Sequence, residues 1–168
     1  EITVAIKGAD VYTGIKKVDP QPKLNKAMFK DGCIVGTMHK LIGEKNDQWD
    51  LNPTFAWANP EAEQKNGTYK YSFQTTRDGD IEWKLMIKKN EWKAGVYLGN
   101  RANTANKVAV GSSEQELYYD HRQLEGSNLS STIEKDKTCT ITIKVEDYKV
   151  TAKVELTKGK DKPKNLFA

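Results

Sequence analysis

Residues 67–101 read GTYKYSFQTTRDGDIEWKLMIKKNEWKAGVYLGNR, and this stretch decides the fold. Residues 69–74 alternate aromatic with polar side chains, the period-two pattern of a strand with one buried face. The pattern returns in 81–88, where the apolar positions are Ile81, Trp83, Leu85 and Ile87. Between the two segments, Asp78-Gly79 is a dipeptide that favours a tight turn. The stretch therefore predicts a β-hairpin that leads into a loop carrying Trp92.

Strand-like segments recur along the chain, and no segment shows sustained helical periodicity. They are residues 2–7, 33–36, 107–110, 117–119, 138–145 and 149–156, of which the last two predict a second hairpin. Residues 26–29 allow one helical turn, and residues 39–66 read as loops because Gly, Asn and Pro punctuate them. Many short strands without helices between them predict an all-β fold, an immunoglobulin-like antiparallel β-sandwich.

Length and charge suggest how the chain is organised. Its 168 residues suffice for one domain with its own core. We expect an N-terminal strand and approach segment packed on the module at 1–30, the sandwich at 31–157, and a basic tail or linker at 158–168. The net charge is +4 and much of the excess lies in that tail, so nucleic-acid binding is not expected. No apolar run in the sequence is long enough to span a membrane.

Few residues could carry chemistry. A hydrolase needs a nucleophile and base, or two carboxylates around the scissile bond. The two histidines, His39 and His121, lie in no recognisable motif, and we interpret both as surface or loop residues. Asp78-Gly79-Asp80 lacks the downstream ligands of a calcium loop. We therefore expect no enzymatic activity, no metal site and no cofactor.

The two cysteines leave the redox compartment open. Cys139 falls on the apolar side of its strand, where a buried free thiol is the simplest interpretation. A Cys33–Cys139 disulfide stays open at this point, because sequence does not give the pairing geometry.

Two tryptophans stand among polar residues in loop contexts. Trp49 follows Asn46-Asp47-Gln48, and Trp92 follows Asn90-Glu91. An indole placed there exposes a large apolar face unless the ring folds back on the sandwich or a ligand covers it. Trp83 differs, because its strand phase predicts a core position.

An exposed indole flanked by amides and charged groups suits a sugar. The C–H face of a pyranose packs on the ring while its hydroxyls meet polar side chains. Covering about 60 Å² of each of two rings is worth roughly 3 kcal/mol at about 25 cal/mol per Å². Ordering entropy opposes binding, so we expect a dissociation constant of about 0.1–1 mM for a short oligosaccharide. Such affinity is useful on a polymer or beside other modules.

Two groups of motifs carry a resemblance to a known family. IVGT (34–37), KLIG (40–43) and QWD (48–50) resemble the V-G-S…L-G-x-W-D opening of the starch-binding domains found on glucoamylases and pullulanases. IEWK (81–84), EW (91–92) and GNR (99–101) resemble the I-E-Y-K…W-E…G-N-R segment of that family. The similarity covers roughly residues 33–101 and extends to the starch-adherence proteins that gut bacteria display outside the cell.

The resemblance implies a noncatalytic, immunoglobulin-like sandwich with one main sugar site. By match to the family motifs, Trp49, Lys84 and Trp92 form this site, and Asn100 is a candidate hydroxyl partner. In that family, the segment before the first tryptophan is short, whereas in this chain residues 44–48 make it longer.

The sequence thus predicts noncatalytic binding of α-glucan, meaning starch, glycogen or malto-oligosaccharides. We expect a monomeric module of a larger extracellular protein, secreted or attached to the cell surface, with other modules of that protein as neighbours. The alternative is a structural or adhesion sandwich whose tryptophans bind a protein partner. Trp quenching by malto-oligosaccharides would favour the first, and retention on a partner protein the second.

Overall fold

The computed structural model describes residues 2–7, 10–15, 26–29, 32–42, 49, 67–87, 97–99, 107–119, 128–147 and 149–160. In chain order the elements are β1 (Ile2–Lys7), β2 (Asp10–Ile15), a 3₁₀ turn η1 (Lys26–Phe29), β3 (Cys33–Gly36), α1 (His39–Ile42), β4 (Thr68–Gln74), β5 (Gly79–Met86), β6 (Tyr97–Gly99), β7 (Gln115–Tyr119), β8 (Leu129–Ile133), β9 (Lys137–Glu146) and β10 (Lys149–Lys158).

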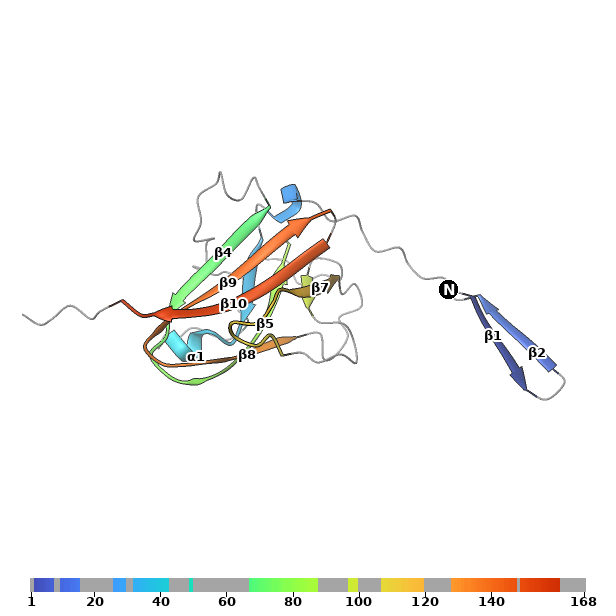
Figure 1. Ribbon diagram of the computed structural model, residues 1–168, viewed down its shortest axis with the longest axis horizontal. Coiled ribbons are helices and arrows are strands. Elements are labelled where there is room, and N and C mark those ends of the chain that lie inside the picture. The colour runs from blue at the N-terminus through green and yellow to red at the C-terminus, as the bar shows by residue number, and fades with distance from the viewer. Residues whose placement is uncertain are drawn as a thin grey trace, which may run out of the picture.

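The larger strands form two layers, which we call sheet I and sheet II. In sheet I, β4, β9 and β10 lie side by side (Figure 1), and β10 also pairs with β7. In sheet II, β5 pairs with β3, β6 and β8. All of these ladders are antiparallel, and almost no helix interrupts them. The predicted all-β antiparallel sandwich is confirmed.

Strand β7 connects the two sheets. Its first part pairs with β10, where Leu117 is the partner of Val150, and its last two residues pair with β6. A strand that changes sheets in this way closes a corner of a sandwich. The described strands from β3 to β10 are therefore linked by one continuous path of pairing.

The predicted β4–β5 hairpin is wrong, although both strands exist. Strand β4 pairs with β9, so that Tyr71 faces Ile141, whereas β5 pairs with strands of the other sheet. Residues 75–78 carry the chain from one sheet to the other. Each strand has one apolar face, and these faces meet across the core instead of lying side by side in one sheet. Alternation identifies such a face but not the neighbouring strand.

One core lies between the sheets. Its largest fully buried side chain is Trp83, with 0% exposure, which confirms the predicted core position. The indole N–H donates to Ser131 Oγ at 3.3 Å, and Ser131 Oγ donates to the Val108 carbonyl at 2.9 Å. The polar atom that comes with this large ring is therefore satisfied inside the core. Inward residues of both sheets complete the cluster, among them Tyr69, Phe73, Ile81, Leu85, Ile141, Ile143, Ala152 and Val154.

The second hairpin, the buried strand at 33–36 and the helical turn at 26–29 agree with the prediction. Three strands were not predicted, namely β2, β6 and β8. Of the predicted strand at 107–110, only Lys107 makes a bridge, to Ser130. The expectation for His39 is wrong, because it lies in α1 and is only 4% exposed. His121 lies outside the described residues.

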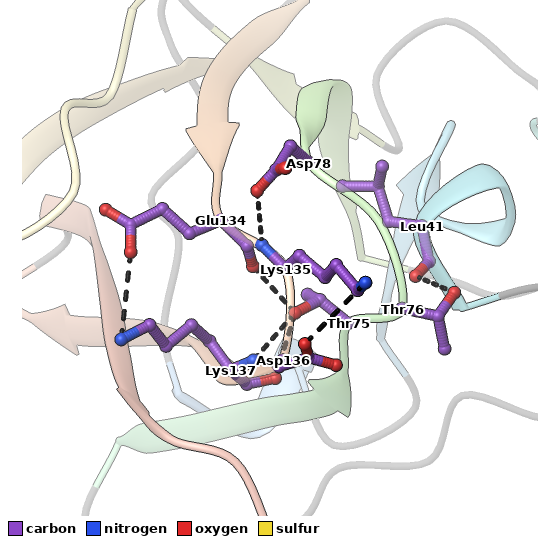
Figure 2. A network of polar contacts seen from close by, with 8 residues as sticks. All are labelled: Leu41, Thr75, Thr76, Asp78, Glu134, Lys135, Asp136 and Lys137. Carbon is purple, nitrogen blue, oxygen red and sulfur yellow. Dashed lines mark hydrogen bonds and ion pairs between the residues drawn. The ribbon is translucent and has the colours of Figure 1, made fainter.

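One end of the sandwich is closed by a network around Thr75 (Figure 2). Thr75 Oγ1 donates to the Glu134 carbonyl at 2.7 Å and accepts from the Lys137 N–H at 3.0 Å. Its neighbour Thr76 donates to the Leu41 carbonyl of α1 through both N–H and hydroxyl, at 2.6 and 3.0 Å. The turn that leaves β4 is thereby joined to the β8–β9 turn and to α1.

At the N-terminus, β1 and β2 pair with each other in a separate two-stranded sheet. How residues 1–30 pack on the module stays a prediction. Within the ranges that the structure describes, no helix has the length and apolar character needed to cross a membrane.

Candidate functional site

Trp49 lies on the outer face of sheet II. Strand β3 is buried on both faces, which is typical of a short continuous apolar run. Its outward residues Cys33 and Val35 form a small cluster with Met86 of β5, and Trp49 packs against this cluster. The tryptophan remains partly exposed. Trp49 thus packs on an apolar patch of the sheet, while part of the residue stays accessible.

The backbone of Trp49 is fixed in an uncommon conformation. Its φ is 63°, in the left-handed region that non-glycine residues rarely adopt. The Trp49 N–H donates to the Gly36 carbonyl at 3.0 Å, which ties this residue to the end of β3. A bulky residue held in such a conformation points to a functional constraint.

Lys84 shares this face. In β5, inward residues such as Trp83 and Leu85 alternate with outward ones, so Lys84 and Met86 project on the same side. Lys84 is the register partner of Val35, which belongs to the patch under Trp49. Cross-strand partners in such a pair are close neighbours. The fold therefore places Trp49 and Lys84, two of the four predicted site residues, on the same face of sheet II.

The close contact between β3 and β5 depends on Gly36. A Cβ built on Gly36 would lie 2.0 Å from the Glu82 carbonyl oxygen and 2.8 Å from the Trp83 Cα. The next residue, Thr37, makes two hydrogen bonds with the backbone of Glu82. The Thr37 N–H donates to the Glu82 carbonyl at 2.9 Å, and the Glu82 N–H donates to Thr37 Oγ1 at 3.0 Å. This corner sets the position of Trp49 relative to β5.

The structure does not describe the other two predicted site residues. Trp92 and Asn100 fall outside the described residues, so their roles stay predictions. Asn100 follows directly on β6, whose residues 97 and 98 pair with Met86 and Leu85.

Cys33 and Cys139 are both buried, and no disulfide joins them. Cys139 belongs to the core between the sheets and Cys33 to the patch under Trp49. The simplest interpretation of Cys139, a buried free thiol, is confirmed. Burial raises the pKa of the Cys139 thiol from 9.0 to about 12. Among the residues described, no group of acidic, histidine and cysteine side chains is arranged to hold a metal ion.

A polar cleft that the sequence does not reveal lies beside the β9–β10 turn. Its volume is about 360 Å³, and it is lined by Glu114, Lys144, Glu146, Asp147, Lys149 and Thr151. Two of its charged groups, Lys144 and Glu146, pair with each other. Lys144 Nζ lies 2.8 Å from Glu146 Oε2, and this hydrogen bond, with the charge attraction, lowers the pKa of Glu146 and raises that of Lys144. Thr151 donates to Glu114 at 2.9 Å. The cleft has polar groups but no aromatic side chain in its lining.

Comparison of the chain with protein-family models, with curated proteins and with solved structures gives no match.

Proposed function

We propose that this chain is a noncatalytic module that binds α-glucan by stacking a sugar ring on Trp49, with Lys84 as a hydroxyl partner. The observation that carries the proposal is the shared face of these two residues on sheet II. A partly exposed indole beside a charged donor is the combination that holds a pyranose ring, because the ring has an apolar C–H face and a polar rim.

The conformation of Trp49 adds support. A structural tryptophan gains most by full burial, whereas Trp49 stays partly exposed at a positive φ. Its tie to Gly36 orders the residue before any ligand arrives, and this order lowers the entropic cost of binding. The motif resemblance supports α-glucan as the sugar, and the proposal extends to display outside the cell as part of a larger protein.

Affinity electrophoresis in gels containing glycogen tests the proposal. The native protein should be retarded, and Trp49→Ala should migrate as in a gel without glycogen while its melting transition stays close to that of the native protein. Lys84→Ala should lower the affinity measured by retardation about 10- to 150-fold, since a hydrogen bond that involves a charged group is worth about 1.5–3 kcal/mol. The matched control is Lys70→Ala, because Lys70 is likewise partly buried on an outer face, but of sheet I.

Unchanged migration of the native protein at all glycogen concentrations would contradict the proposal. Retention of Trp49-dependent binding to a protein instead of glycogen would favour the adhesion alternative, in which the indole serves an interface.

A further inference from the structure

The outer face of sheet II continues past Lys84 as a row of polar side chains. Glu82 and Asp80 follow Lys84 at alternate positions of β5, each about 6.6–6.8 Å further along the strand. Both are exposed. Strand β8 runs beside this row, with Ser130 as the register partner of Glu82 and Thr132 as that of Asp80.

The row is held by bonds between neighbouring strands. Asn128, just before β8, donates from Nδ2 to Glu82 Oε2 at 3.3 Å. Thr132 Oγ1 donates to Asp80 Oδ1 at 2.6 Å. These bonds leave further acceptor positions on both carboxylates, because each ionised carboxylate has about four lone-pair sites. The row thus presents oriented acceptors next to amide and hydroxyl groups.

The same corner that fixes Trp49 also fixes Glu82. Gly36 accepts the N–H of Trp49, and the next residue, Thr37, bonds both the N–H and the carbonyl of Glu82. The backbones of Trp49 and Glu82 are therefore held by two consecutive residues of one chain segment. Backbones that are ordered before a ligand binds lower the entropic cost of a contact with both residues.

Charge decides which ligand suits this row. Two carboxylates, those of Asp80 and Glu82, follow Lys84 along the outward side of β5, and Lys107 lies beyond them as the bridge partner of Ser130. A sulfated or uronate polymer would meet like charges there, and bringing like charges together is costly. A neutral sugar meets acceptors for its hydroxyl protons instead.

We infer that the sugar chain runs along β5 from Trp49 past Lys84, that Glu82 and Asn128 bind its hydroxyls, and that the site selects neutral over anionic glycans. This inference rests on the proposed function and adds the path of the ligand and its charge class.

Isothermal titration with maltoheptaose tests the path. Glu82→Gln keeps the size of the side chain and should weaken binding about tenfold, since a bond to a charged acceptor is stronger than one to an amide. Asn128→Ala should weaken it about threefold. The matched control is Glu155→Gln, which changes a carboxylate of strand β10 in sheet I and should leave the affinity unchanged. Thermal melting confirms that each variant is folded.

The outcomes separate the inference from the proposed function. If Trp49→Ala abolishes binding while Glu82→Gln and Asn128→Ala both bind as the native protein does, the path along β5 is wrong and the proposed function stands. Absence of maltoheptaose binding by the native protein overturns both. A second titration uses a heparin hexasaccharide, for which no binding is expected at physiological salt. Binding of this probe at least as tight as that of maltoheptaose would overturn the selection of neutral glycans.

Discussion

Neighbouring residues on the two faces of β5 have different roles in this account, one in the core and one in the proposed sugar site. Trp83 points inward and is wholly buried, with its N–H satisfied by Ser131. Lys84, the next residue, faces outward beside the patch that Trp49 covers. Alternation along one strand thus places a core residue and a site residue next to each other in sequence. A substitution at one position should affect stability, and one at the other should affect binding.

At the residue scale, the buried thiol of Cys139 predicts a pH dependence of stability. Its pKa is raised from 9.0 to about 12, so the unfolded chain releases this proton at lower pH than the folded protein. The contribution is present in full below pH 9 and is lost as the pH rises toward 12, by about 1.4 kcal/mol of unfolding free energy per pH unit. Urea unfolding at several pH values measures this slope.

Cys139→Val is the control, because it keeps an apolar side chain of similar size without a titrating group. The difference in unfolding free energy between the native protein and this variant should shift steadily above pH 9. A difference that is constant from pH 8 to pH 11 would contradict a buried, neutral thiol.

At the scale of elements, the turn between β4 and β5 depends on one hydroxyl. Thr75→Val keeps the shape of the side chain but leaves the Lys137 N–H without its acceptor in a buried place. We expect a loss of about 2 kcal/mol of unfolding free energy, the usual cost of a buried unsatisfied group. Thr75→Ser, which keeps the hydroxyl, should lose clearly less. Equal losses for the two variants, measured by urea unfolding, would show that the methyl group and not the hydroxyl matters.

The contact of β3 with β5 gives a second prediction at this scale. Gly36→Ala puts a Cβ against the Glu82 carbonyl, 2.0 Å away in the present geometry, so the strands must separate. We expect a loss of about 1–3 kcal/mol of stability, as for other overpacked sites. Maltoheptaose affinity should fall too, because Gly36 also holds Trp49.

Gly111→Ala is the comparison for this variant. Gly111 has a φ of 72° and nothing within 4 Å of a built Cβ, so only backbone strain opposes the change. It should lower stability and leave sugar affinity unchanged. An unaltered affinity of folded Gly36→Ala would mean that this corner does not position the site.

The strands also show which parts of the fold could be predicted from the sequence. Alternation correctly placed the inward residues of β4, β5 and β9, because burial of one face imposes period two. It did not reveal that residues 75–78 cross between sheets, since a hairpin and a crossing turn have the same local pattern. Strand β8 (LSSTI) was missed because serine and threonine weaken its alternation, although Ser131 is buried as the partner of Trp83. His39 is buried because it lies in α1. This helix has only four residues, which is too short to show a helical pattern in the sequence.

For the candidate site, the sequence supplied Trp49 and Lys84 through motif resemblance. It could not supply the covered patch, because Cys33, Val35 and Met86 meet only when β3 pairs with β5. Nor could it show the bond between Asn128 and Glu82, which lie 46 positions apart. Contacts of this range follow from tertiary pairing and carry no local signal.

At the scale of the whole molecule, the small net charge predicts how binding responds to salt. Sugar stacking and hydroxyl contacts release no counterions, so the maltoheptaose affinity should change less than about twofold between about 50 and about 500 mM NaCl. Isothermal titration at both salt concentrations measures this. A loss of affinity by orders of magnitude would contradict binding by stacking and hydroxyl contacts, because a neutral sugar releases no counterions.

The central claim is that sugar binds on the outer face of sheet II. Titration of the ¹⁵N-labelled protein with maltoheptaose, followed by amide and indole chemical shifts, tests it most directly. The account predicts that the Trp49 indole and the amides of residues 33–37 and 82–86 shift together with one dissociation constant, while those of β9 and β10 stay unchanged. Shifts confined to β9 and β10, or none at millimolar sugar, would contradict it.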